Sequence, residues 1–468
     1  MTDSIDRRTL EAWDDAHVWH PFTPHAVYRA EEPLLVERGE GHWLIDVDGN
    51  RYLDAVSSIW CSAFGHRRRE LDDAIRDQLD RIAHATFLGH ASVPAIHLAK
   101  RLVDLAPDPL TRVFFSDNGS TASEIAVKMA YQYCQQAEGG RWKNRTRFLA
   151  LGNAYNGDTL GAVSVGGVPL FHATFRNLLF PVHRAPSPYC YRCPLGLERA
   201  TCGVACLDET LRLIETHADE LAGVIVEPGF QGAGGVITYP EGWLRSVREA
   251  TERHGILLIL DEVAAGCGRT GTFFACEREG VVPDFLCLAK MLTGGYLPLA
   301  VTLTTEHVFD AFVAPPEEGR TFFHGHTFTG NALGAAAALA TLDVFENDRI
   351  LDTLPATIAH LEQALTRLAD HPHVGDIRTC GLAAGIELVA DRDTRTPFPT
   401  ADRFAHRVCR HARDRGVFLR PIGDVLIVMP PLTIDTEEID LIADALAHGL
   451  EQATAEQQAR TPAEPTEP

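Results

Sequence analysis

The sequence has no long apolar run. No stretch approaches the roughly 18 consecutive apolar residues that a membrane-spanning helix needs. The opening residues, MTDSIDRRTLEAWDDAH, are acidic and lack the apolar core of a secretory signal. From these absences we expect a cytoplasmic protein without a membrane partner.

Positive charge is also scarce. The 42 Lys and Arg residues are outnumbered by 64 Asp and Glu residues, which gives a formal net charge of −22. No basic run exceeds the triplet at residues 67–69, so we expect no nucleic-acid partner. The 11 cysteines are an odd number and stand mostly alone within apolar segments. This pattern favours a reducing compartment over a disulfide framework.

The middle of the chain has an alternating pattern. Between about residues 110 and 300, short apolar runs alternate with longer amphipathic stretches; the runs are TRVFFSD, RFLALGN, GVIVEP, GILLILDEV and DFLCLAK. Such alternation predicts an α/β fold with a mainly parallel sheet covered on both faces. We expect residues 1–65 to form the N-terminal part of a smaller lobe, 66–345 a large domain, 346–455 a C-terminal small domain and 456–468 a disordered tail.

Each apolar run ends in a polar residue. These residues are Asp117, Asn153, Glu227, Asp261 and Lys290. Ligands of open parallel sheets gather outside the carboxyl ends of the strands. We therefore expect these five side chains to surround one site.

Two of these residues carry opposite charge. Asp261 and Lys290 each end an apolar run, and a buried charge is costly unless it is paired. They form either a plain salt bridge or the two sides of a cofactor site, unless Lys290 simply extends to solvent. Pyridoxal phosphate needs a lysine, an acid near its ring nitrogen and a cradle for its phosphate, and an aromatic side chain such as Tyr155 would stack on its ring.

The segment SDNGSTASE is a candidate phosphate cradle. It places Gly119 and Ser120 between a predicted strand and a predicted helix. Free N–H groups at a helix start can bind an anion. The alternative is an ordinary capped helix, because Thr121 and Glu124 have capping-box spacing.

Two longer motifs carry a family resemblance. LILDEVAAGCGRTG, followed by LAKMLTGG, resembles class III aminotransferases of the fold-type I pyridoxal-phosphate enzymes, and the similarity runs from about Trp19 to Leu450. The resemblance implies a large pyridoxal-phosphate-binding domain and a smaller lobe built from both chain ends. It also implies that Lys290 is the Schiff-base lysine and proton carrier, and that Asp261 keeps the ring nitrogen protonated.

The resemblance implies further roles. Gly119 and Ser120 would bind the phosphate, and His326 and Thr327 would reach it from the other subunit of a homodimer. The pocket for small-molecule substrates would be formed by Trp60, Tyr155, Gly325 and Arg420, with Arg420 binding a substrate carboxylate. Arg269 is either a second carboxylate ligand or part of a structural ion pair, and Asp158 either contacts the substrate amine or caps the next helix. No metal is expected at this site.

Within the class, other motifs resemble the biotin-synthesis branch. They are VWHPFTPHAVY, LDAVSSIWCSAFGH, VEPGFQGAGG, FFHGHTFTGN and LRPIGDVLIVMPP. This likeness implies conversion of 8-amino-7-oxononanoate to 7,8-diaminononanoate. Ala233 and Ala264 stand where ornithine- and 4-aminobutyrate-type relatives commonly have Glu and Gln. Phe22 stands where many relatives have Tyr, and Ile59 where relatives that use S-adenosylmethionine often have Trp. HGHTFTGN and GGYLPLA resemble members that take the amino group from lysine, so the donor is S-adenosylmethionine or L-lysine.

Two other functions stay open at this stage. One is another ω-amine or diamine transaminase that uses pyruvate or 2-oxoglutarate. The second is a pyridoxal-phosphate-binding regulator without turnover, although Lys290, Asp261 and Tyr155 together argue against it.

One cluster lies outside the family pattern. CYRCPLGLERATCGVAC contains Cys190, Cys193, Cys202 and Cys206 with C-x2-C-x8-C-x3-C spacing. This spacing is compatible with a structural zinc ion, or with free or redox-paired thiols.

Overall fold

A seven-stranded sheet forms the centre of the protein. The structure is a computed structural model that describes residues 5–31 and 33–460. The strand order is β4-β12-β11-β10-β7-β5-β6. The strands are β4 (Leu110–Ser116), β5 (Arg147–Leu151), β6 (His183–Ala185), β7 (Leu221–Val226), β10 (Leu257–Asp261), β11 (Phe285–Leu288) and β12 (Ala300–Thr305). Strand β12 is antiparallel to both neighbours, and the other pairs are parallel, so the predicted α/β sheet is confirmed.

The sheet buries both of its faces. Strands β7 and β10 are buried at every position. Ile225 and Ile259 enter the same apolar cluster as helix α6 (Gly119–Gln136), whereas Val224 and Leu258 enter the cluster of α10 (Trp243–His254). Successive side chains of a strand point to opposite faces, so a sheet covered twice needs apolar residues throughout. This requirement explains the continuous apolar runs in the sequence.

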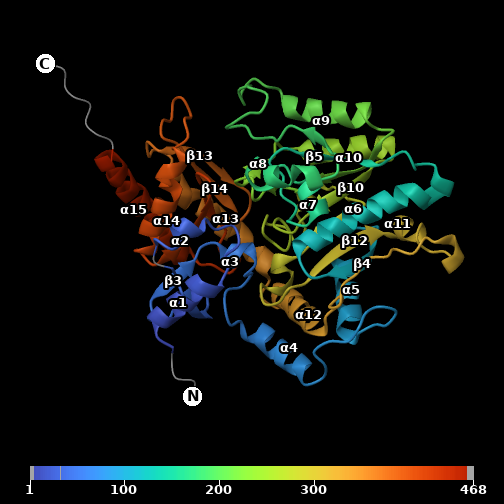
Figure 1. The fold of residues 1–468 in the computed structure, drawn as a ribbon, viewed down its shortest axis with the longest axis horizontal. Coiled ribbons are helices and arrows are strands. Elements are labelled where there is room, and N and C mark those ends of the chain that lie inside the picture. The colour runs from blue at the N-terminus through green and yellow to red at the C-terminus, as the bar shows by residue number, and fades with distance from the viewer. Residues whose placement is uncertain (1–4, 32, 461–468) are drawn as a thin grey trace.

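Further helices surround this large domain (Figure 1). They are α4 (Arg69–Leu79), α5 (Val93–Leu105), α7 (Leu160–Val165), α8 (Pro169–His172), α9 (Ala205–Thr216), α11 (Glu306–Asp310) and α12 (Ala332–Asn347). A short hairpin, β8 (Phe230–Gln231) with β9 (Ile237–Thr238), lies after β7. The expected domain boundary at residue 345 falls inside α12. In the described part of the chain, no helix is both long and apolar enough to cross a membrane.

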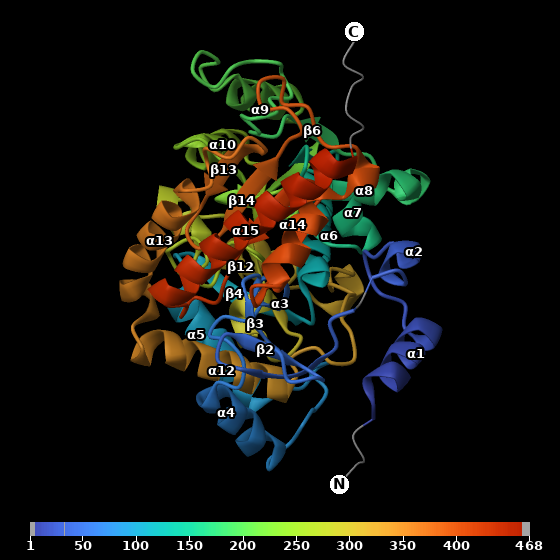
Figure 2. The same ribbon diagram turned by 90° about the vertical axis from the view of Figure 1, so that its left-hand side faces the viewer.

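The smaller lobe is built from both chain ends. Its first sheet joins β1 (Val36–Glu40), β2 (Trp43–Asp46) and β3 (Arg51–Asp54) to β15 (Val417–Phe418). Strand β15 pairs in parallel with β3, so residues more than 360 positions apart are neighbours. Figures 1 and 2 show the blue N-terminal elements beside the orange and red C-terminal elements.

The C-terminal part of this lobe has a second sheet and three helices. The sheet order is β13-β14-β17-β16. The strands are β13 (Val374–Thr379), β14 (Ala384–Leu388), β16 (Arg420–Ile422) and β17 (Val425–Val428), and the helices are α13 (Ile350–Thr366), α14 (Phe404–Arg413) and α15 (Thr436–Arg460). Near the N-terminus lie α1 (Arg7–His17), α2 (His25–Tyr28) and α3 (Ser57–Trp60).

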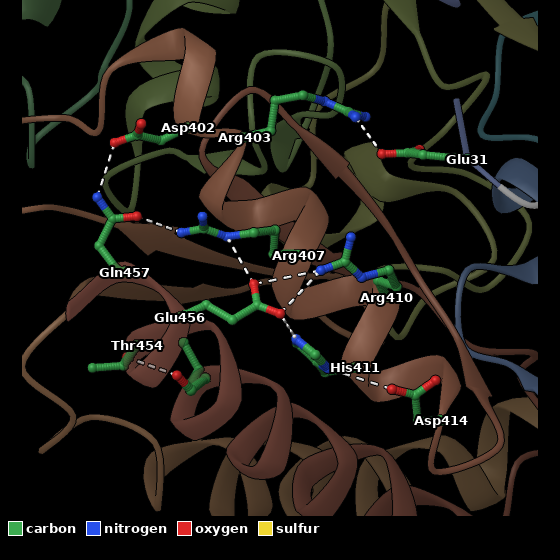
Figure 3. A network of polar contacts seen from close by, with 11 residues as sticks. Glu31, Asp402, Arg403, Arg407, Arg410, His411, Asp414, Thr454, Glu456 and Gln457 are labelled. Atoms are coloured by element: carbon green, nitrogen blue, oxygen red, sulfur yellow. Dashed lines mark hydrogen bonds and ion pairs between the residues drawn. The ribbon is translucent and has the colours of Figure 1, made fainter. Parts of the chain in front are cut away.

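The predicted tail begins too early. Helix α15 continues to residue 460, and its last turns bind α14 and the segment before it (Figure 3). Glu456 accepts a hydrogen bond from His411 at 2.8 Å, and the Gln457 amide donates to Asp402 at 3.0 Å. The polar composition of residues 456–460 thus reflects contacts to another helix. Residues 461–468 of the predicted tail lie outside the described residues.

Candidate active site

A cavity of about 380 Å³ opens at the carboxyl ends of the central strands. Four of the five predicted strand-end residues line it: Asp117, Glu227, Asp261 and Lys290. Asn153 does not line it. Its backbone has φ of +59° and its N–H donates to Gly167 O at 3.0 Å, so Asn153 serves a turn.

Asp261 is held in a fixed orientation. Its side chain is 4% exposed; Oδ2 accepts from the Ser123 hydroxyl at 2.9 Å and Oδ1 accepts from the Val263 N–H at 3.1 Å. Burial raises the pKa of Asp261, whereas these two donors and Lys290 lower it. The sequence reasoning missed Ser123, although it lies one turn after Ser120 on the same helix face.

Lys290 lies at the next strand end. It follows β11 with φ of +48°, and its ammonium lies 5.5 Å from the centre of the Trp60 ring. Burial lowers the pKa of Lys290, and the carboxylates of Asp261 and Glu227 oppose this shift. A lowered pKa increases the share of neutral amine, which is the nucleophilic form.

Glu227 is a second buried carboxyl group in the cavity. Its two oxygens accept from the Tyr155 N–H at 3.0 Å and the Gly232 N–H at 2.9 Å. Burial and the nearby Asp261 raise the pKa of Glu227 to about 8. The sequence placed Glu227 at this edge without giving it a role.

The start of α6 forms an anion cradle. A Cβ at Gly119 would lie 2.5 Å from Val263 Cγ1, so the backbone approaches the strand end closely. The Ser120 hydroxyl accepts from the Asp158 N–H at 3.0 Å. Asn118, Gly119 and Ser120 line the cavity, so the start of the helix with its free N–H groups is the candidate anion site.

The cap of this helix differs from the predicted one. Asn118 is the N-cap, and it exchanges hydrogen bonds reciprocally with Thr121. Glu124 is not part of the box. Its carboxylate instead accepts from the Thr159 hydroxyl at 2.5 Å and the Ala162 N–H at 3.1 Å, because α7 begins beside α6.

Tyr155 forms one wall of the cavity. Its hydroxyl donates to Asp158 Oδ2 at 2.8 Å, and its ring is nearly parallel to the His172 ring, 6.4 Å away. Burial and Asp158 raise the pKa of Tyr155, so the hydroxyl keeps its proton. Asp158 does not cap the next helix, because Thr159 occupies the N-cap position of α7.

Trp60 is presented by an unusual backbone turn. Residues 57–60 all have positive φ, from 47° to 72°, although none is glycine. The turn is held by Ser57, whose hydroxyl donates to Met429 O at 2.7 Å, and by Ser58, whose hydroxyl donates to Asp54 at 2.7 Å. Left-handed conformations cost roughly 1–2 kcal/mol per non-glycine residue. This strained turn directs the Trp60 ring toward Lys290.

Arg269 has neither of its predicted roles. It is fully buried, and its guanidinium donates to Leu382 O at 2.9 Å and Pro430 O at 2.7 Å. It does not line the cavity, and it makes no ion pair with any described residue. Burial lowers the pKa of Arg269 to about 9. Its contacts join the large domain to the smaller lobe.

Four predicted residues lie outside this chain's own cavity. Gly325, His326 and Thr327 follow one another in an exposed segment and do not line it. His326 Nε2 lies 3.9 Å from Asp117 Oδ1 at the cavity edge. Arg420 is exposed on β16 of the smaller lobe. The roles of these four residues stay predictions.

Comparison with known proteins decides the family. Residues 26–450 match the aminotransferase class-III family. The chain belongs to this family. Adenosylmethionine-8-amino-7-oxononanoate aminotransferase of Nitratidesulfovibrio vulgaris is 56% identical over 92% of this chain and 80% of the relative. The enzyme of the same name from Geobacter sulfurreducens is 53% identical over 96% of this chain and 99% of the relative.

Solved structures of class-III enzymes share this fold. The crystal structure of adenosylmethionine-8-amino-7-oxononanoate aminotransferase from Methanocaldococcus jannaschii has a TM-score of 0.91 at 45% identity, covering 96% of this chain and 99% of that chain. An (S)-enantioselective omega-transaminase from Thermomicrobium roseum has a TM-score of 0.90 at 35% identity, covering 97% of this chain and 100% of that chain. The fold-type I assignment is confirmed.

The cavity of this class-III aminotransferase fits pyridoxal phosphate. Lys290 supplies an amine in the cavity wall, Asp261 is a fixed acid, and at the start of α6 a Cβ at Gly119 would have no room. The amide of Asn156 is buried in the cavity wall and has no partner among the described residues. The protein is a pyridoxal-phosphate-dependent aminotransferase.

Replacement of the cavity lysine tests its role. We expect Lys290→Ala to lose covalent attachment of the cofactor and to lower kcat by at least about 10²–10⁴-fold, because no other amine lies at this position. Borohydride reduction followed by intact-mass measurement checks the attachment. Lys100→Ala, an exposed lysine on α5, is the matched control and should behave as the wild type.

Glu227 predicts a pH dependence of stability. Because its pKa is raised to about 8 in the folded apoprotein, the folded state binds more protons than the unfolded state between about pH 4.3 and pH 8. The contribution of protonated Glu227 to the free energy of unfolding is fully present below the unfolded pKa of about 4.3, and it is lost as the pH rises through the folded pKa of about 8. We expect Glu227→Gln to remove up to about 1.4 kcal/mol per pH unit of this slope.

Urea unfolding of the apoprotein at several pH values measures the slope. Glu215→Gln, an exposed change on α9, serves as the control. An unchanged slope in Glu227→Gln would contradict the prediction.

Proposed function

We propose that this aminotransferase converts 8-amino-7-oxononanoate to 7,8-diaminononanoate in biotin biosynthesis, with S-adenosylmethionine as the amino donor. The observation that carries the proposal is the 53–56% identity, over more than nine-tenths of the chain, to enzymes named for this reaction. The cavity agrees with it, since Ala233 and Ala264 leave space opposite Trp60 for a long, largely apolar substrate.

The chain's own residues supply the positioning and the proton transfer. When bound, pyridoxal phosphate supplies an aldehyde that takes up the amino group and a ring that withdraws electrons from the adjacent carbon. Asp261, fixed by Ser123 and Val263, keeps the ring nitrogen protonated. Lys290 Nζ, with its lowered pKa, accepts the proton from the amine-bearing carbon and later returns a proton to the carbon of the accepting ketone.

Tyr155, held by Asp158, forms one wall of the cavity. The Tyr155 hydroxyl retains its proton across the neutral range and donates a hydrogen bond to Asp158, so its oxygen is left to accept a hydrogen bond from a bound group. The N–H groups at the start of α6 bind the phosphate and fix the position of the ring.

The donor and the acceptor are tested in one experiment. The protein is purified with pyridoxal phosphate, and S-adenosylmethionine and L-lysine are added in separate cuvettes. Conversion of the cofactor to its amino form by S-adenosylmethionine, reversed by 8-amino-7-oxononanoate, is the expected result. Conversion by L-lysine alone would assign the other donor. A response only to simple ω-amines with pyruvate or 2-oxoglutarate would replace the proposal with an omega-transaminase, the activity named for relatives at 29–35% identity.

Arg420 is the group we propose for the substrate carboxylate. It is exposed on β16, and no hydrogen bond or ion pair of its guanidinium occurs within the described residues. We expect Arg420→Met to raise KM for 8-amino-7-oxononanoate about 10–100-fold, since a hydrogen bond to a charged group contributes about 1.5–3 kcal/mol. Half-reaction titrations with the donor and with the acceptor separate an effect on donor binding from an effect on the binding of 8-amino-7-oxononanoate. Arg392→Met, an exposed arginine after β14, is the control.

We also propose that the enzyme is a cytoplasmic homodimer with shared active sites. The segment that carries Gly325, His326 and Thr327 is flanked by Phe323 and Phe328, which are 84% and 60% exposed in the single chain. Exposed apolar groups of this kind are typical of an interface. All eleven cysteines are free thiols, which fits a reducing compartment.

Subunit mixing tests the shared site. If Thr327 binds the phosphate of the partner, a heterodimer of Lys290→Ala and Thr327→Asp chains has one site with both changes and one intact site. Activity after unfolding and refolding the mixture should then rise well above the mean of the two parents. If Thr327 acts within its own chain, both sites carry one change each and the activity should stay at that mean.

A further inference from the structure

Four cysteines gather in the segment between β6 and α9. Most cysteines of this chain are core residues; the buried ones are Cys134, Cys267, Cys276, Cys287, Cys380 and Cys409. Cys190, Cys193, Cys202 and Cys206 are only half-buried, and all four line one cavity of about 20 Å³. A space of this volume holds about one water-sized atom.

The backbone brings the two cysteine pairs to this cavity by tight turns. After the first pair, the Gly196 N–H donates to Cys193 O at 3.0 Å. In the second pair, Gly203 and Val204 have φ of +57° and +61°, which places Cys202 just before the start of α9. Cys206 then lies in the first turn of that helix. Two tight turns that bring four cysteines to one cavity are typical of a zinc knuckle.

Redox or disulfide chemistry explains the cluster less well. No disulfide joins the four residues. Cys190, Cys193, Cys202 and Cys206 all line one cavity, whereas a disulfide joins only two sulfurs. Thiols gathered in this number can all bind one divalent cation as thiolates.

We propose that Cys190, Cys193, Cys202 and Cys206 bind one zinc ion as a four-thiolate structural site. Soft thiolate ligands in this number favour zinc among divalent ions, and the cavity has room for one ion but not for a multi-iron cluster. Among the described residues, no three of these sulfurs lie within 4.8 Å of one another, so binding of the ion would require the cysteine side chains to turn toward it.

A second group of ligands provides the natural comparison. Among the described residues, His183, His217 and Glu220 are the group whose ligand atoms already lie within 4.8 Å of one another. Glu220 Oε1 lies 2.5 Å from His217 Nδ1 and 3.1 Å from His183 Nε2. The hydrogen bond between His217 and Glu220, with the His183 ring stacked on His217, accounts for this arrangement without a metal. His217 caps the far end of α9 from Cys206, so the two groups can be changed separately.

The position of the cysteine segment indicates what the ion stabilises. Tyr189 and Arg192 come directly before Cys190 and Cys193, and both bind Glu387 on β14 of the smaller lobe. Arg395 donates to Tyr191 O at 2.9 Å. Just before the cysteine segment, the Ser187 hydroxyl donates to the Gln231 side chain, and Gln231 lies shortly after the cavity residue Glu227 in the sequence. The zinc site would therefore fix a segment that joins the smaller lobe to the wall of the active site.

Metal analysis of the pyridoxal-phosphate-loaded enzyme tests the proposal. We expect about one zinc per chain by plasma mass spectrometry. Cys193→Ser/Cys202→Ser should lose this zinc and melt at a lower temperature, whereas His183→Ala/His217→Ala should keep it. Cobalt added to zinc-free enzyme should give the intense near-ultraviolet bands of thiolate ligation, and these bands should be absent from the cysteine variant.

A chelator experiment covers the case in which the cysteine variant does not fold. Zinc withdrawal from the wild-type enzyme should release about four additional reactive thiols per zinc ion. The proposal is overturned by wild-type enzyme without metal, by iron in place of zinc, by zinc lost only from the histidine variant, or by zinc release without new thiols.

Discussion

The placement of Asp261 and Lys290 at adjacent strand ends is the constraint on which the active site depends. Their opposite charges line the same cavity, and each opposes the shift that burial causes in the pKa of the other. Parallel pairing of β10 with β11 sets their spacing, and Ser123 on α6 fixes the orientation of the acid. The sheet topology therefore sets the positions of Asp261 and Lys290 relative to each other.

Hydrogen bonds to backbone carbonyl groups connect the smaller lobe to the surroundings of these two residues. The Arg269 guanidinium donates to Leu382 O and Pro430 O of the smaller lobe. The turn that carries Trp60 is bonded to Met429 O, again in that lobe. Movement of the lobe would shift the Trp60 ring relative to Lys290, so pocket shape and lobe position are coupled.

Much of this arrangement could be predicted from the sequence, because apolar runs ending in polar residues are a direct consequence of a doubly covered parallel sheet. The sheet and four of the five strand-end residues follow from that pattern. The errors arose where tertiary contacts outweigh local composition. Glu124 has capping-box spacing but binds α7, and residues 456–460 are polar because they bind α14. Arg269 lies in a motif rich in glycine, and only the fold shows that it is enclosed by carbonyl groups.

The left-handed turn at residues 57–60 has a consequence for how this enzyme can be altered. Each positive φ there is a conformation that glycine adopts freely, so a glycine at Ser58 or Ile59 would relieve strain and yet release the Trp60 ring. The four residues therefore hold backbone strain that the presentation of the Trp60 ring to the cavity requires.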